Sequence, residues 1–178
     1  MTDVTEKAAG VSVMARGSRF TWLILSLVVV AADQFTKLQL TGALTLYQRV
    51  PVLPFVDFVR LHNTGAAFSF LAGASGWQNW LFMGVAVVVS AGVLWWLMRL
   101  PVRSKKLLAL GLALLLGGAV GNLIDRVIYG YVIDFILVHY RDWSFPAFNV
   151  ADSAISCGVV LVLFDGLILE RRDARERD

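Results

Sequence analysis

The chain has 178 residues, of which 58% are hydrophobic and 16% are charged, and its mean hydropathy is +0.70. This composition excludes an ordinary soluble domain and predicts an integral membrane protein. The net charge of +3 does not indicate nucleic-acid binding, because the basic residues stand in short clusters beside apolar runs. The single cysteine, Cys157, offers no disulfide framework or thiolate metal site and is interpreted as a small helix-packing residue.

Four apolar stretches are long enough to span a bilayer, and they cover about residues 20–40, 77–98, 107–128 and 151–169. Residues 1–19 are polar and are expected to form a flexible cytoplasmic tail. A secretory signal peptide is the alternative for the first apolar run, but three later spans favour a retained helix. Near the end of this helix Asp33 and Lys37 share a face, either as a local ion pair with a snorkelling lysine or as part of a site.

The connection between the first two spans carries a strand signal and a polar motif. Residues 55–61 nearly alternate in polarity, which predicts a short strand or hairpin at the membrane surface, with Asp57 as a surface charge. The next residues include Asn63 and Gly65, which form either an ordinary turn or a ligand-binding segment. His62 is interpreted as a loop histidine, because it has no metal-like spacing to His139.

The second span is flanked by tryptophans at both ends, as interfacial anchors are. In the third span Gly117 and Gly121 form a pair of small residues suited to close helix packing. Gly118, Asn122 and Asp125 share one face of this helix. Asp125 next to Arg126 is interpreted either as a structural ion pair or as part of a site.

Two further aspartates follow the third span. Residues 132–138 form a β-branched run with Asp134 inside it, which predicts a strand carrying a carboxylate. Asp152 comes three residues after Asn149, so the two could form the N-cap and the third position of the fourth helix. A site role for Asp152 stays open beside that interpretation. Residues 171–178 form a charged tail, and Asp165 is expected near its arginines.

The distribution of basic residues predicts the orientation of the chain. Four spans place both termini on one side of the membrane, and that side collects eleven basic residues: Lys7, Arg16, Arg19, Arg99, Arg103, Lys105, Lys106, Arg171, Arg172, Arg175 and Arg177. The other side collects five: Lys37, Arg49, Arg60, Arg126 and Arg141. The positive-inside rule therefore places both termini in the cytoplasm and the polar groups at the ends of the spans near the extracytoplasmic leaflet.

Carboxylates are the chemistry that this sequence offers. It has no serine-hydrolase motif to supply a nucleophile and no histidine cluster to bind zinc, so it does not indicate a nucleophilic or zinc-dependent hydrolase. Two aspartates that share a proton can act as a base that activates water and an acid that protonates a leaving amine. Spacing leaves the choice among Asp125, Asp134 and Asp152 open, since each comes from a different element.

Five sequence blocks occur together and in a fixed order: Asp33-Gln34-Phe35-Thr36-Lys37, Asn63-Thr64-Gly65-Ala66-Ala67-Phe68, the run 117–126, Val132-Ile133-Asp134-Phe135 and Phe148-Asn149-Val150-Ala151-Asp152. In these blocks the chain resembles the bacterial lipoprotein signal peptidases, the signal peptidase II family. The resemblance implies one peptidase domain over residues 20–170, an all-α membrane bundle of four transmembrane helices with a small extracytoplasmic β-sheet or hairpin.

The resemblance also implies the reaction and the residues that perform it. The family removes the signal peptide on the amino side of a diacylglyceryl-modified cysteine, with catalytic aspartates that fall on Asp134 and Asp152. Supporting residues would be Asp33, Lys37, Asn63, Gly65, Gly118, Asn122, Asp125, Arg126, Asn149 and Ala151, with Asn63 and Arg126 expected to hold the substrate backbone. The implied enzyme is a monomer of the bacterial inner membrane that needs no metal or other cofactor and contacts membrane lipid. Globomycin-type cyclic peptides would inhibit it.

Two alternatives explain the intramembrane carboxylates less well, and a third stays open. A small proton-coupled carrier predicts polar residues across the depth of the bilayer, whereas those of this chain gather in one leaflet. A membrane scaffold without enzymatic activity leaves the carboxylates unexplained. A metal-dependent hydrolase that uses the same aspartates would lose its activity to a chelator.

Overall fold

The computed structural model describes residues 2–65, 77–102 and 104–169, and the side chains of residues 19–168 within those ranges. This part of the chain contains four long helices, and the last continues into a π-helical turn: α1 (Thr2–Ala43), α2 (Trp77–Arg99), α3 (Lys106–Tyr129), α4 (Val150–Phe164) and η2 (Asp165–Leu169). Four segments are long and apolar enough to cross a membrane, Arg19–Ala43, Trp77–Arg99, Lys106–Tyr129 and Val150–Ile168. The four predicted spans are confirmed.

Helix α1 is longer than the sequence predicted. It begins at Thr2, so the expectation of a flexible segment over residues 1–19 differs from the helix in this structure. Residues 2–19 contain no proline and only two glycines, so no residue in this stretch strongly opposes a helix that continues from the span. The π-helical turn η2 was not predicted either. Residues 171–178, predicted to be a charged tail, lie outside the described residues.

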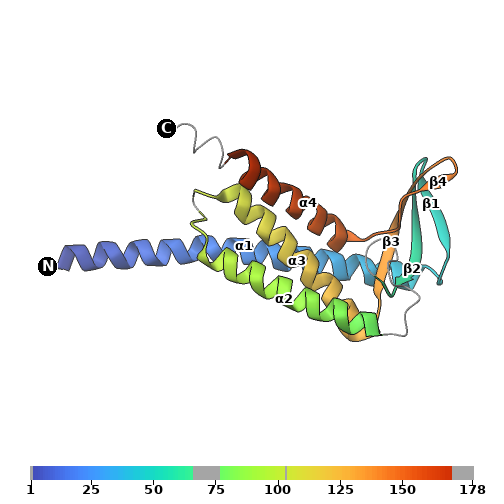
Figure 1. Cartoon of the computed structure of the whole chain (residues 1–178), viewed down its shortest axis with the longest axis horizontal. Coiled ribbons are helices and arrows are strands. Elements are labelled where there is room, and N and C mark those ends of the chain that lie inside the picture. The colour runs from blue at the N-terminus through green and yellow to red at the C-terminus, as the bar shows by residue number, and fades with distance from the viewer. Residues whose placement is uncertain (1, 66–76, 103, 170–178) are drawn as a thin grey trace.

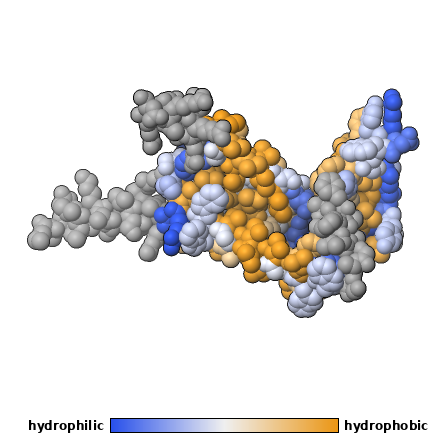
Figure 2. Space-filling model, viewed as in Figure 1, coloured by the Kyte–Doolittle hydropathy of each residue, from blue (hydrophilic) through white to orange (hydrophobic). Residues whose placement is uncertain are grey.

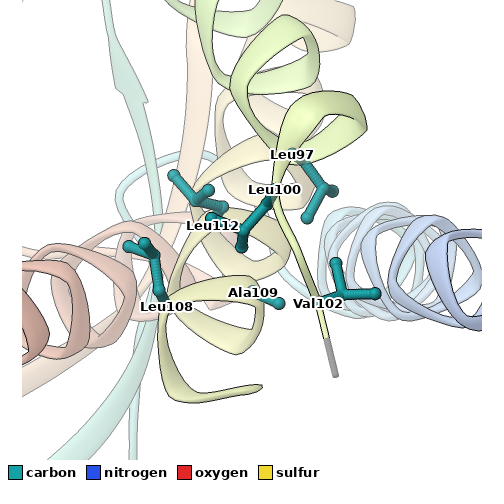
Figure 3. Packing of buried hydrophobic residues seen from close by; sticks show 6 residues of the cluster. All are labelled: Leu97, Leu100, Val102, Leu108, Ala109 and Leu112. Carbon is teal, nitrogen blue, oxygen red and sulfur yellow. The ribbon is translucent and has the colours of Figure 1, made fainter. Parts of the chain in front are cut away.

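Helix α3 is the centre of the bundle (Figure 1). It packs against α1, α2 and α4, and more than half of its apolar stretch is buried, whereas α2 is almost entirely exposed. A hydrophobic cluster closes the bundle where α2 turns into α3 (Figure 3), and it consists of Leu97, Leu100, Val102, Leu108, Ala109 and Leu112. Apolar side chains also cover the outer surface of the helices (Figure 2), as expected of a surface in contact with lipid.

A small antiparallel sheet lies at the other end of the bundle (Figure 1). Its strands follow the order β1 (Arg49–Leu53), β2 (Val56–Asn63), β3 (Val132–Tyr140) and β4 (Trp143–Ser144). The predicted strands at residues 55–61 and 132–138 are therefore confirmed. The sheet extends sideways from the bundle on the side of α4, so the sheet and α4 form the two walls of a notch (Figure 2).

Asp57 is not the surface charge that the sequence indicated. It is only 2% exposed, and its carboxylate pairs with Arg49 and lies 3.2 Å from Nε2 of His139. Burial alone would raise the pKa of Asp57, but hydrogen bonds and attraction from the two basic side chains lower the pKa below its usual value. Asp57 therefore ties β2 to both neighbouring strands.

Candidate active site

A cavity of about 940 Å³ occupies the notch between the sheet and α4. Both Asp134 and Asp152 line it, together with Asn63, Asn122 and Arg126. These five residues come from β2, α3, β3 and α4, and all five were among the predicted site residues. The fold thus brings the polar groups of separate sequence blocks into one place.

Asp134 lies on β3 opposite Leu61 of β2, and it is 3% exposed. Its carboxylate accepts two amide hydrogen bonds, from Nδ2 of Asn63 at 3.0 Å and from Nδ2 of Asn149 at 2.9 Å. Burial, and next the negative charge of Asp152, raise the pKa of Asp134 to about 7. Asp134 is therefore a carboxyl group that can carry a proton near neutral pH.

Asp152 lies in the first turn of α4 and is part of a capping box. Asn149 is the N-cap residue: its Oδ1 accepts from the backbone N–H of Asp152 at 2.9 Å, and its own backbone N–H donates to Oδ2 of Asp152 at 3.2 Å. The predicted cap is confirmed. Asp152 also lines the cavity and accepts from Nδ2 of Asn122 at 2.7 Å, so the capping role and a site role coexist.

Two buried asparagines connect the aspartates. The side chain of Asn149 is fully buried, and its Nδ2 donates to Oδ1 of Asn122 at 3.1 Å as well as to Asp134. Asn122 in turn donates to Asp152. This chain of hydrogen bonds, from Asp134 through Asn149 and Asn122 to Asp152, holds both carboxylates in one fixed arrangement.

Beneath the asparagines lies a buried ionic group, here called the lysine hub, formed by Lys37, Asp33 and Asp125. These residues are 1%, 0% and 0% exposed. Nζ of Lys37 lies 2.7 Å from Asp33 and 2.9 Å from Asp125, and it donates to Oδ1 of Asn122 at 3.1 Å. The ion pair of Asp33 and Lys37 is thus confirmed, but the lysine is buried instead of snorkelling, and Asp125 pairs with Lys37 and not with its neighbour Arg126.

The lysine hub also holds the backbone beside each aspartate of the cavity. Oδ1 of Asp33 accepts from the N–H of Ala151 at 2.9 Å, and Oδ2 of Asp125 accepts from the N–H of Ile133 at 3.1 Å. Ala151 directly precedes Asp152, and Ile133 directly precedes Asp134. The hub therefore positions the start of α4 and the start of β3 relative to each other.

Arg126 lies on the wall of the cavity formed by α3 and β2. It donates to the carbonyl oxygens of Asn122 and Gly65, both at 3.3 Å, and its guanidinium stands 5.6 Å from the ring centre of Phe82. The backbone N–H of Gly65 donates to Oδ1 of Asn63 at 3.0 Å. The predicted turn at Asn63 and Gly65 thus forms, and its amide side chain faces Asp134.

Three glycines allow α3 to approach its neighbours closely. A Cβ atom on Gly117 would lie 2.7 Å from Cβ of Val29, and one on Gly121 would lie 2.8 Å from Oδ2 of Asp33. The close packing predicted for Gly117 and Gly121 is therefore confirmed. A Cβ atom on Gly118 would likewise lie 2.4 Å from the carbonyl oxygen of Ala151. All three distances are shorter than van der Waals contact.

One residue that contacts the lysine hub was not among the predicted site residues. Gln34 donates from Nε2 to Oδ1 of Asp125 at 2.8 Å and also contacts the carbonyl oxygen of Gly121 at 3.2 Å. Gln34 directly follows Asp33 in the same polar block, and this position could have indicated that it belongs to the site. Within residues 2–65, 77–102 and 104–169 there is no group of three or more histidine, cysteine or acidic side chains that could hold a metal ion.

Four helices that are long and apolar enough to cross a membrane, and two buried carboxylates that line one cavity, fit a membrane-embedded aspartic peptidase. A family model described as Signal peptidase (SPase) II matches residues 25–168. The chain belongs to this family, and it is a multi-pass membrane enzyme of the lipoprotein signal peptidase type.

Relatives and solved structures agree with this assignment. The chain is 51% identical over 157 residues to a lipoprotein signal peptidase of Ectopseudomonas mendocina, covering 85% of this chain and 92% of that one. It is 55% identical over 152 residues to a lipoprotein signal peptidase of Pseudomonas putida, covering 84% and 88%. A solved structure described as a bacterial membrane enzyme superposes with a TM-score of 0.74 at 29% identity, covering 83% of this chain and 87% of that one.

Proposed function

We propose that the chain cleaves lipoprotein precursors on the amino side of a diacylglyceryl-modified cysteine, with Asp134 and Asp152 as the catalytic pair. One observation supports this assignment more than any other. The two carboxylates come from different elements, line one cavity and are joined by the amides of Asn149 and Asn122. Paired carboxylates of this kind can divide the roles of base and acid.

The surroundings of the two aspartates favour one division of roles. Asp134 carries the proton, because its pKa is raised to about 7 by burial and by Asp152. Asp152 is the base, since it lies in the first turn of α4, where the N-terminus of the helix favours a negative charge. As water attacks the scissile carbonyl carbon, Asp152 takes a proton from the water and Asp134 gives its proton to the leaving amine. Proton transfer from Asp152 to Asp134 then restores the pair.

Other residues would bind the substrate and shape the site. Asn63 and Arg126 line the cavity, and their amide and guanidinium groups would hold the peptide backbone next to the scissile bond. Globomycin-type cyclic peptides would compete for the same groups. The lysine hub, Gly118 and Ala151 fix the wall behind them. The enzyme would act as a monomer.

The site would face the extracytoplasmic side of the bacterial inner membrane, with both termini in the cytoplasm. The count of eleven basic residues against five supports this orientation. A cysteine introduced at Ser144, which lines the cavity, tests it in a Cys157→Ser background. An impermeant maleimide added outside intact cells should label that cysteine, and labelling only after the cells are opened would contradict the orientation.

Product mapping tests the reaction. The purified full chain in detergent is incubated with a lipidated precursor, and mass spectrometry of the products locates the cut. The expected products are the free signal peptide and a protein that begins with the lipidated cysteine, formed at the same rate with and without a chelator. A cut elsewhere, or loss of activity with the chelator, would contradict the proposal.

A further inference from the structure

A row of three aromatic side chains leads from the outer part of the sheet to the aspartate pair. This aromatic row consists of Trp143, Phe145 and Phe148. The ring centres of Trp143 and Phe145 lie 6.2 Å apart, and those of Phe145 and Phe148 lie 6.0 Å apart. Trp143 is 59% exposed and Phe145 is 39% exposed. The row thus presents an apolar surface that packing within the described protein leaves partly uncovered.

Backbone hydrogen bonds fix the row relative to the catalytic pair. Phe148 exchanges hydrogen bonds with Ile136 of β3, at 3.0 Å and 2.9 Å, and the N–H of Phe145 donates to the carbonyl oxygen of Val138 at 2.8 Å. Phe148 directly precedes Asn149, whose side chain binds Asp134. A group held against the row is therefore held at a fixed position relative to the scissile bond.

The cavity is lined by both polar and apolar side chains. Asn63, Asn122 and Arg126 line it with the two aspartates, and a hydrocarbon chain against them would remove water from polar groups without replacing their hydrogen bonds. Phe145 and Phe148 also line it, as do Leu137 and Pro146. An apolar part of the substrate therefore fits better against Phe145 and Phe148 than against the polar groups.

The row also lies where the bilayer could supply such a group. The notch between the sheet and α4 is visible on the surface (Figure 2), and Ile155 of the membrane-spanning helix α4 lines the cavity as well. A chain that lies in the cavity is therefore next to a helix that is long and apolar enough to cross the membrane.

We propose that the aromatic row is a subsite for an acyl chain of the lipidated residue in the precursor. This inference rests on the proposed function, in which the lipidated residue directly follows the cut. In this arrangement the residue after the cut and its lipid lie against the sheet, and the row selects lipidated precursors through apolar contact.

The test compares two precursors with the same peptide, one carrying long acyl chains and one carrying short acyl chains. KM and kcat are measured for the full chain and for Phe145→Ala and Trp143→Ala. The matched control is Phe55→Ala, because Phe55 is also an exposed aromatic residue of the sheet region, at 54%, but it does not line the cavity.

Phe145→Ala should raise KM for the long-chain precursor about tenfold and leave its kcat and the short-chain KM nearly unchanged. Trp143→Ala should change KM in the same direction, and Phe55→Ala should not. An unchanged KM, or an equal rise for both precursors, would overturn the proposal. A third precursor, altered only in the apolar residues before the cut, gives a further check. If Phe145→Ala changes selectivity for those residues and not for chain length, the row holds the signal peptide instead.

Failure of the subsite can be distinguished from failure of the proposed function. The same precursors are offered to Asp152→Asn. If that variant cleaves them at the normal rate, the catalytic assignment is wrong. If it is inactive while Phe145→Ala shows no dependence on chain length, the catalytic assignment stands and only the subsite is wrong.

Discussion

Replacing Lys37 with methionine should destabilise the enzyme strongly. Methionine has a similar length but no charge, so the variant leaves Asp33 and Asp125 buried at 0% exposure without the ammonium group that lies 2.7 Å and 2.9 Å from them. Removing one partner of a buried ion pair typically costs about 3–5 kcal/mol, because the remaining charge loses its compensation. The hydrogen bonds from Asp33 to Ala151 and from Asp125 to Ile133 should weaken at the same time.

Thermal and denaturant unfolding of the full chain in detergent measure this effect. We expect the unfolding free energy of Lys37→Met to fall by about 3–5 kcal/mol and the Tm to fall on the order of 10 °C. The matched control is Lys106→Met at the exposed start of α3, which should change the unfolding free energy by less than about 0.5 kcal/mol. The double variant Lys37→Met with Asp125→Asn should recover part of the loss, because it removes one of the uncompensated charges.

Two results would refute the reasoning about the lysine hub. One is a Lys37→Met enzyme whose unfolding free energy stays within about 1 kcal/mol of the unchanged chain, well below the expected range. The other is a double variant that loses as much unfolding free energy as the two single variants together, or more. The charges of Lys37 and Asp125 would then not compensate each other.

Three further variants test the packing and the titration of the site. Because the pKa of Asp134 is raised from 3.8 to about 7, kcat/KM should fall above about pH 7, and the unfolding free energy should decline between these pH values in the unchanged chain but less in Asp134→Asn. Gly118→Ala should cost about 1–3 kcal/mol of unfolding free energy, since its Cβ would lie 2.4 Å from a backbone oxygen, whereas Gly84→Ala on an open face of α2 should not destabilise the fold. The pKa of Asp57 is lowered, so its contribution to stability is present above its unfolded pKa and lost as the pH falls through the lower folded value. As the pH is lowered, Asp57→Asn should therefore lose less unfolding free energy than the unchanged chain. An identical loss would contradict the contacts of Asp57 with Arg49 and His139.

The elements of the fold could be predicted from the sequence because their signals are local. An apolar stretch of the right length indicates a span, and the β-branched run around Asp134 indicates a strand. The spacing from Asn149 to Asp152 likewise indicated the capping box. The same local spacing could not show that Asp152 also lines the cavity, because the cavity forms only when β3 and α4 meet.

The partners of buried charges could not be predicted in this way. Asp125 stands next to Arg126 in the sequence, but the packing of α3 against α1 brings it to Lys37 instead. Asp57 looked like a surface charge because strand alternation alone does not tell which face is covered. Gln34 is uncharged and was not predicted as a site residue, yet its side chain donates a hydrogen bond to Asp125. In each case the contact depends on tertiary packing.

The most direct test of the central claim is the cleavage rate of Asp134→Asn and Asp152→Asn on a lipidated precursor. Asp57→Asn is the matched control, because Asp57 is also a buried aspartate of the sheet but lies outside the cavity. Thermal unfolding first establishes that each variant is folded. We expect both site variants to lose at least about 10²–10⁴-fold in kcat, the range for loss of general acid or base catalysis, and the control to cleave at nearly the normal rate. A folded Asp134→Asn or Asp152→Asn enzyme that cleaves at the normal rate would contradict the assignment of the catalytic pair.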